Sequence, residues 1–253
     1  MCFSKEAVAV STFVLLHGSW HGSWAWRGVR RRLAERGHTI FTPTLAGCAE
    51  RFDANNHAVT LRTHINEIAG MLRFEDLDNV VVVGHSYAGT LLESIAALEP
   101  ERVRHLINLD GHILDPGQRA YDFWSSEQVD EALTSTEAGH PFRKPHPPET
   151  LGITDPAQRR WVSARLTPHP LGCYRESVPP ETIPSTTAAR TYVRCMAGPI
   201  THMFDVHAVR ARERGWSVSE IDAPHDAMIT HPDVLADQLA DIASQAMAHP
   251  GHR

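Results

Sequence analysis

The 253-residue sequence has no excess of positive charge and no long apolar segment. Its formal net charge of −6 at pH 7 gives no electrostatic reason to expect nucleic acid or an anionic membrane as a partner. No stretch approaches the roughly 20 apolar residues of a transmembrane helix. Residues 7–16 are apolar, but no cleavage-site pattern follows them, so we interpret them as a strand rather than as a signal peptide.

Cysteine is scarce, and metal-binding spacings are absent. The four cysteines form no C-x-x-C pair, which predicts reduced, mostly buried thiols in a cytoplasmic protein: Cys2, Cys48, Cys173 and Cys195. The seventeen histidines are many, but none is arranged as H-E-x-x-H or in a comparable ligand spacing. We therefore expect no metal site and no cofactor, and we expect most histidines at the surface.

The most informative stretch begins with four consecutive valines, Val80 to Val83, which predict a strand buried on both faces. Gly84 and Ser86 follow, and apolar residues then recur at helical spacing from Leu91 to Leu98. A strand, a sharp turn with serine at its apex and a helix form a nucleophile elbow, which exposes the serine Oγ beside helix N–H groups. The alternative is an ordinary turn serine after a buried strand.

The G-x-S-x-G form of this motif is slightly altered. Its fifth position is Ala88, and the glycine stands one residue later, at Gly89. Small residues are needed there because the helix and the strand pack closely, and alanine adds only a methyl group. We expect an intact but slightly crowded elbow.

The rest of the chain predicts a single α/β domain with a mostly parallel sheet. Further strands are expected at residues 13–16, 38–42, 103–109, 191–196 and 216–221. Amphipathic helices are expected at about residues 24–36, 61–72, 202–214 and 233–247. Arginines of the first helix, Arg30 to Arg32 and Arg36, are expected to form a solvated face.

Residues 112–187 differ in amino-acid composition from the rest of the chain. Ten of the seventeen prolines fall between Pro141 and Pro184, and nothing there resembles a parallel strand. Helices are expected at 121–136 and 155–166. We interpret this segment as a cap inserted into a core of residues 1–111 and 188–253, with Phe123, Trp124 and Trp161 lining the substrate pocket. A disordered linker is the alternative, which the tryptophans disfavour.

Three segments together resemble the α/β-hydrolase fold, in the branch of plant methyl-ester esterases, hydroxynitrile lyases and their bacterial esterase-like relatives. They are residues 13–22 (FVLLHGSWHG), 84–89 (GHSYAG) and 225–228 (HDAM). The resemblance implies helices on both faces of the sheet and a small cap. It also implies that Ser86 is the nucleophile, that His225 is the base, and that the backbone N–H groups of Ser19 and Tyr87 form the oxyanion hole. His17 and Trp20 are further candidates for the pocket.

The acid of the triad departs from the plant pattern. The plant enzymes carry an aspartate after the strand that matches residues 191–196, whereas this chain has Ala-Gly-Pro-Ile at 197–200. We expect Asp110, at the end of a strand next to the nucleophile strand, to orient His225. Asp205 and Asp226 are weaker candidates, and a purely structural role for Asp110 is the alternative.

Three further positions bear on the reaction. Hydroxynitrile lyases of this branch have lysine where this chain has Asp226, threonine at Gly18 and glutamate at His85, which favours hydrolysis here. We predict a cofactor-independent serine hydrolase for a small or medium carboxylic ester, such as a methyl ester or a lactone. A lyase, cyclase or acyl transferase on the same scaffold, or a non-catalytic ligand-binding protein, remains the alternative. A homodimer is left open.

Overall fold

A six-stranded sheet forms the centre of the molecule. The computed structural model describes residues 10–54, 58–182 and 188–248, so Cys2 lies outside the described residues. The strand order is β2-β1-β3-β4-β7-β8, and every neighbouring pair is parallel. The strands are β1 (Thr12–Leu16), β2 (Thr39–Phe41), β3 (Val80–His85), β4 (Val103–Leu109), β7 (Ala189–Cys195) and β8 (Ser217–Ile221). The predicted α/β class with a mostly parallel sheet is confirmed.

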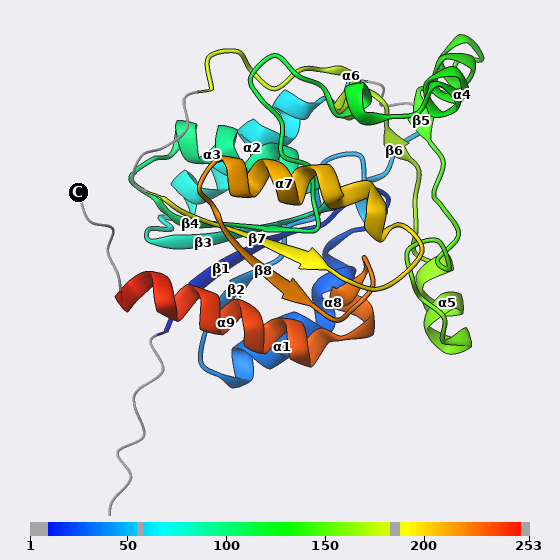
Figure 1. Cartoon of the computed structure of the whole chain (residues 1–253). Coiled ribbons are helices and arrows are strands. Elements are labelled where there is room, and N and C mark those ends of the chain that lie inside the picture. The colour runs from blue at the N-terminus through cyan, green and yellow to red at the C-terminus, as the bar shows by residue number, and fades with distance from the viewer. Residues whose placement is uncertain (1–9, 55–57, 183–187, 249–253) are drawn as a thin grey trace, which may run out of the picture.

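Helices cover both faces of the sheet (Figure 1). They are α1 (Arg27–Glu35), α2 (Leu61–Phe74), α3 (Leu92–Leu98), α7 (Asp205–Glu213), α8 (Ala227–Thr230) and α9 (Pro232–Ala248). The valines of β3 explain this arrangement. Val80 and Val82 pack into the core cluster that includes α2 and α3, whereas Val81 and Val83 pack into the cluster that includes α1 and α9. Successive strand residues point to opposite faces, so an unbroken valine run requires cover on both.

The arginine-rich face of α1 is only partly solvated. Arg30 and Arg31 are exposed, as expected. Arg32 and Arg36 instead donate to the carboxylate of Asp237 on α9, at 3.1 and 2.8 Å. These contacts join two helices that lie side by side on one face of the sheet.

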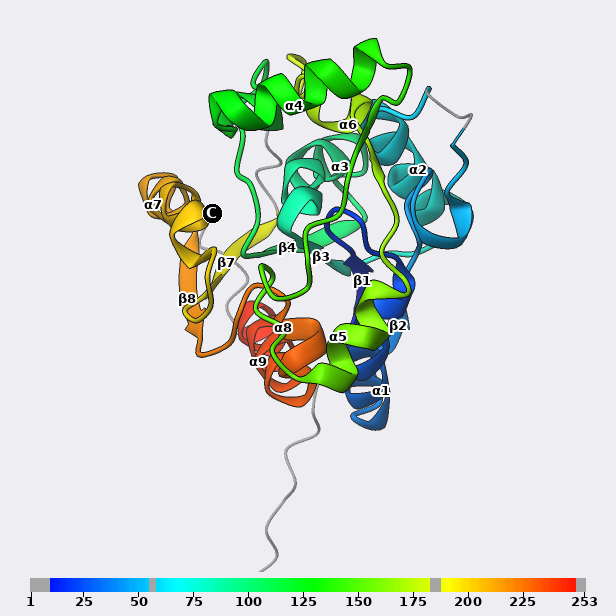
Figure 2. The same cartoon turned by 90° about the vertical axis from the view of Figure 1, so that its right-hand side faces the viewer.

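The segment between β4 and β7 contains α4 (Ser126–Glu137), α5 (Pro156–Ser163) and the short α6 (Gly172–Arg175). Asp155 caps α5 by accepting a hydrogen bond from the Gln158 N–H at 2.7 Å. Strands β5 (Phe142–Arg143) and β6 (His169–Pro170) form a small antiparallel pair that the sequence did not predict. In Figure 2, α4 lies at the top of the view and α5 lies well below it. None of the helices over the described ranges is long and apolar enough to cross a membrane.

Candidate active site

Ser86 lies at the apex of a sharp turn after β3. Its φ is +55°, a left-handed conformation that is strained for a residue with a side chain. A short 3-10 helix (Ser86–Leu91) follows and leads into α3. A Cβ on Gly84 would lie 2.6 Å from the carbonyl oxygen of Ala88, so only glycine fits there. The backbone is thus shaped as the elbow interpretation predicts, with Ala88 accommodated in the core.

His225 lies in the loop after β8, and Asp110 directly follows β4. The Nδ1–H of His225 donates to Asp110 Oδ2 at 2.7 Å, and Oδ1 of the same carboxylate accepts from the Cys195 N–H at 3.2 Å. Asp110 is completely buried. Because Nδ1 carries the proton in this bond, Nε2 of the neutral imidazole is left as the acceptor.

The other two candidate acids lie elsewhere. Asp226 pairs with His21, whose Nε2 lies 3.1 Å from Asp226 Oδ2 inside the protein. Burial would raise the pKa of Asp226, but the charge and hydrogen bond of His21 outweigh it and lower the pKa. Asp205 pairs with Arg194 at the surface. Of the three aspartates, Asp110 is the one that is hydrogen-bonded to the His225 ring.

Ser86 and His225 line the same cavity, of about 290 Å³. Predicted residues in its wall are Ser19, Trp20, Phe123 and Trp124. Four larger hollows among the described residues contain neither Ser86 nor His225. The smaller cavity is therefore the candidate active site.

Two residues predicted for the pocket, His17 and Trp161, are not in its wall. His17 is buried: its Nδ1–H donates to Gly18 O at 2.8 Å, and its Nε2 accepts from the Leu45 N–H at 3.0 Å. Burial lowers its pKa to about 3, so it stays neutral and braces the loop after β1. Trp161 packs edge-on against Trp24, with ring centroids 5.2 Å apart. Both expectations are wrong because tertiary partners occupy these side chains.

The cavity wall contains a pair of histidines that the sequence did not predict. The Ile113 N–H donates to His207 Nδ1 at 3.2 Å, so His207 carries its proton on Nε2 and donates to His112 Nδ1 at 2.9 Å. His112 must then carry its proton on Nε2. Burial lowers the pKa of both rings, that of His207 to about 4. The position of His112, two residues beyond Asp110 at a strand end, was the available signal.

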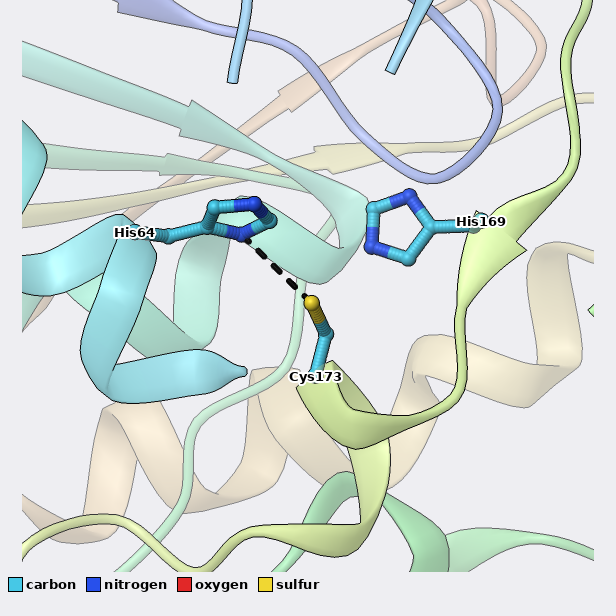
Figure 3. A group of neighbouring side chains, drawn as sticks. All are labelled: His64, His169 and Cys173. Atoms are coloured by element: carbon cyan, nitrogen blue, oxygen red, sulfur yellow. Dashed lines mark hydrogen bonds between the residues drawn. The ribbon is translucent and has the colours of Figure 1, made fainter. Parts of the chain in front are cut away.

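A second buried group supports Tyr87, the residue after the elbow serine. Figure 3 shows His64, His169 and Cys173 pointing toward one another, with the His64–Cys173 contact dashed. His64 Nε2–H donates to Ala46 O at 2.9 Å, which leaves Nδ1 to accept from the Tyr87 hydroxyl at 2.9 Å. The group therefore fixes the Tyr87 side chain, and with it the start of the helix behind Ser86.

The same group offers the ligand types of a zinc site, since one ligand atom from each residue lies within 4.8 Å of the others. However, the His64 lone pair already accepts the Tyr87 hydroxyl. Burial also raises the pKa of Cys173 to about 12, which keeps its thiol protonated. His85, His225 and Asp226 form a second such group. There His85 Nε2–H donates to the His225 carbonyl at 3.0 Å. The expected absence of a metal stays a prediction.

The expectation that most histidines lie at the surface is wrong for the described residues. Nine of them are buried: His17, His21, His38, His64, His85, His105, His169, His207 and His225. Each has at least one hydrogen bond to a ring nitrogen. Apart from the local bonds of His17 and His21, these partners lie at least 23 residues away in the sequence, so spacing alone could not reveal them. The three described cysteines are free and buried, as predicted.

Known proteins resemble this chain in sequence and in fold. The pattern of the alpha/beta hydrolase family matches residues 13–238. A carbendazim-hydrolysing esterase of Nocardioides sp. is 28% identical, over 91% of this chain and 99% of the relative. Methylesterase 7 of Arabidopsis thaliana is 24% identical, over 92% and 96%. An extracellular alpha/beta-hydrolase from a Paenibacillus species has the same fold, with a TM-score of 0.79 at 20% identity over 91% of this chain and 98% of its own.

Proposed function

Because this chain belongs to the alpha/beta hydrolase family, we propose that it is a serine esterase that cleaves a small or medium carboxylic ester. The observation that carries the proposal is the 2.7 Å hydrogen bond between His225 and Asp110 in a cavity that also contains the elbow serine, Ser86. Two relatives support the same chemistry, because one is named as an esterase that hydrolyses carbendazim and the other as a methylesterase.

In the proposed reaction, Nε2 of His225 removes the proton of Ser86 as Oγ attacks the ester carbonyl. Asp110 holds the imidazole in the required tautomer and stabilises the imidazolium that forms. His225 then protonates the leaving alcohol. Water attacks the acyl-enzyme with the same base, which releases the acid and regenerates Ser86.

The backbone N–H groups of Ser19 and Tyr87 are the proposed donors to the tetrahedral oxyanion. Ser19 lines the cavity, and its Oγ accepts from the Tyr174 hydroxyl at 2.5 Å, which fixes this loop residue. Tyr87 is fixed from behind by His64. Two amides that are held before substrate binds need no rearrangement during the reaction.

A steric contact at Gly18 favours hydrolysis over cyanohydrin cleavage. The related lyases have threonine at this position, but a Cβ here would lie 2.8 Å from the Cβ of Ser86 and 2.9 Å from His85 Nδ1. A threonine does not fit without moving the nucleophile. The neighbouring substitutions at His85 and Asp226 agree with this preference.

We also infer that residues 112–187 act as a cap, because Phe123, Trp124 and Arg143 of that segment form part of the cavity wall. A cytoplasmic location and a homodimer remain predictions. A methyl ester or a lactone is the proposed range of substrates.

The proposal is tested by replacing Ser86 with alanine. The variant should lose both fluorophosphonate labelling and ester hydrolysis, because the attacking oxygen is gone, while its melting temperature stays at or above that of the wild type. Ser219→Ala, on β8 and outside the cavity wall, is the matched control and should keep both activities. Labelling that persists at another serine, identified by mass spectrometry, would contradict the assignment.

A non-catalytic binding protein would show no labelling in the wild type. A lyase would be labelled at Ser86 but would cleave a cyanohydrin to an aldehyde and cyanide. An acyl transferase would be labelled too, but would pass the acyl group of an ester to an added alcohol and form a new ester. Product analysis with p-nitrophenyl, methyl and lactone esters in water, with the same esters plus an acceptor alcohol, and with a cyanohydrin therefore separates the three classes.

A further inference from the structure

Arg143 on β5 places a guanidinium in the wall of the candidate active site. Three aromatic rings surround its Cζ atom, with centroids 4.4 Å away at Trp124, 4.9 Å at Trp20 and 5.5 Å at Tyr174. One of its terminal nitrogens donates to His146 Nε2 at 3.2 Å. The side chain is thus held in place by ring faces and by a neutral acceptor rather than by an acid.

The cavity wall has no negative charge to balance this cation. No aspartate or glutamate lines it. Within the described ranges, no carboxylate lies within ion-pair distance of Arg143, and Glu131 lines a neighbouring hollow instead. Asp110, the buried acid next to His225, is hydrogen-bonded to His225 and to the Cys195 N–H.

Three of the four histidines in the wall, His112, His146 and His207, do not add further charge at neutral pH. Burial lowers the pKa of His112, His146 and His207. His146 accepts a hydrogen bond from Arg143, which requires its neutral form. Arg143 is therefore the one fixed cation in the described cavity wall.

A half-buried guanidinium without a carboxylate partner is an unusual arrangement, because a desolvated charge is costly unless it is paired. The three ring faces next to the guanidinium offer no strong acceptor, and the printed bond to His146 uses one terminal nitrogen, so N–H groups remain that can donate to a ligand. This planar fork matches the two oxygens of a carboxylate better than any neutral acceptor. A single positive charge suits a single negative one.

We propose that Arg143 forms a carboxylate subsite, and that the natural substrates are esters that carry a free carboxylate, such as monoesters of dicarboxylic acids. This proposal rests on the proposed esterase function. The ester group lies at Ser86, and the carboxylate of the same molecule forms the ion pair with Arg143. Trp20, Trp124 and Phe123 contact the apolar chain between them.

The test compares monomethyl and dimethyl esters of the same diacids, from succinate to pimelate. The wild type should prefer the monoester at one chain length at least. Arg143→Met, which keeps an unbranched stem among the rings but removes the charge, should lower kcat/KM for that monoester by about 10- to 100-fold, mainly through KM. Its kcat/KM for the dimethyl ester should fall by a clearly smaller factor, so that the preference for the monoester is reduced or lost.

Two further variants distinguish a local ion pair from other effects. Arg143→Lys should restore part of the preference, because it returns the charge without the planar fork. Lys144→Gln removes a cation one residue away on the exposed side of the chain and should leave the preference unchanged. An equal loss on both esters, an equal effect of Lys144→Gln, or a wild type that prefers dimethyl esters at every length would overturn the proposal.

The result also separates this proposal from the one on which it rests. If the wild type hydrolyses dimethyl esters and is labelled at Ser86 but ignores the carboxylate, only the subsite is refuted. If it hydrolyses no ester and is not labelled, the esterase function itself is refuted.

Discussion

The carboxylate that meets His225 comes from β4, whereas the plant relatives place theirs after the strand that corresponds to β7. Strands β4 and β7 are neighbours in the sheet, so an aspartate at the end of either strand can reach the same histidine ring. Its φ of +43° turns the chain at the strand end, and the Cys195 N–H of β7 fixes one carboxylate oxygen. The loop at 197–200 can therefore lack an acid without loss of the His–Asp pair.

Asp110→Asn should keep the fold but reduce kcat strongly. The amide can donate to Nδ1, which stabilises the tautomer with the proton on Nε2, where it cannot accept the Ser86 proton. The corresponding change in a serine protease lowers kcat by about 10⁴. We expect a loss of at least about 100-fold, measured as steady-state ester hydrolysis, with less than a few degrees of change in Tm.

The two other aspartates provide controls for that prediction. Asp205→Asn removes a surface ion pair with Arg194 and should change neither kcat nor Tm much. Asp226→Asn should mainly lower stability, by about 3 kcal/mol, because it leaves His21 without its buried partner. If Asp205→Asn or Asp226→Asn reduced kcat more than Asp110→Asn, the assignment of the acid would be wrong.

At the residue scale, the sequence was sufficient to place those residues whose position depends on a neighbouring strand. Ser86, Asp110 and His225 each follow a strand of one parallel sheet, and the carboxyl ends of such strands meet at one edge. The sequence was not sufficient for residues whose contacts lie far away along the chain. His17 is held by Leu45, and Arg143 meets Trp20 across more than 120 residues, so neither could be placed from spacing.

At the scale of elements, the segment between β4 and β7 serves two different purposes. Phe123, Trp124 and β5 contribute to the cavity wall. Helix α5 packs instead against the core that contains α1 and α9, through Val162 and Trp161. Trp124 and Trp161, both predicted for the pocket, each pack against a core cluster, but of the two only Trp124 also lines the cavity.

Trp124→Ala and Trp161→Ala should differ in their effect on substrate selectivity. The first should change the ratio of kcat/KM values between small and large esters, because its ring lines the cavity, and should also lower Tm, because the ring packs on Tyr121 and Tyr174. The second should lower Tm with no change in that ratio, because its ring packs on Trp24. A substrate panel and thermal unfolding of both variants test this, and identical behaviour would refute the division.

The sheet was predictable from the sequence because buried strands correspond to short apolar runs that are separated by turn residues. Boundaries shifted by a few residues, as at β2 and β7. The antiparallel pair of β5 and β6 was missed, since each strand has two residues and contains or adjoins proline. The one-turn helices α6 and α8 are too short for a periodic signal.

At the scale of the whole molecule, the buried histidines couple stability to pH. Burial lowers the pKa of His17 to about 3, and that of His64, His105 and His207 to about 4. In the unfolded chain each would have a pKa near 6.5. Below pH 6.5 the unfolded state therefore binds more protons. Their contribution to stability is complete above pH 6.5 and is lost as the pH falls toward 4.

We expect the free energy of unfolding to fall steeply below pH 6.5, by about 1.4 kcal/mol per pH unit for each such histidine. His21 opposes this trend: burial lowers its pKa, but Asp226 outweighs that effect and raises it. Guanidinium unfolding between pH 7.5 and 4.5 measures the slope. His105→Gln should reduce the slope of the unfolding free energy against pH by the contribution of about one proton. The control His140→Gln, at an exposed position, should leave that slope unchanged. A stability that is constant from pH 7 to 5 would contradict the prediction.

The left-handed backbone at Ser86 has a consequence for how this protein can change over generations. A non-glycine residue in such a conformation costs about 1–3 kcal/mol. Glycine would relieve that strain while deleting the attacking oxygen. Inactive descendants with glycine at position 86 would fold at least as well as the parent, so the chaperones and proteases that remove poorly folded chains would spare them. The cavity would survive intact in such chains, which gives this scaffold a short route from enzyme to ligand receptor.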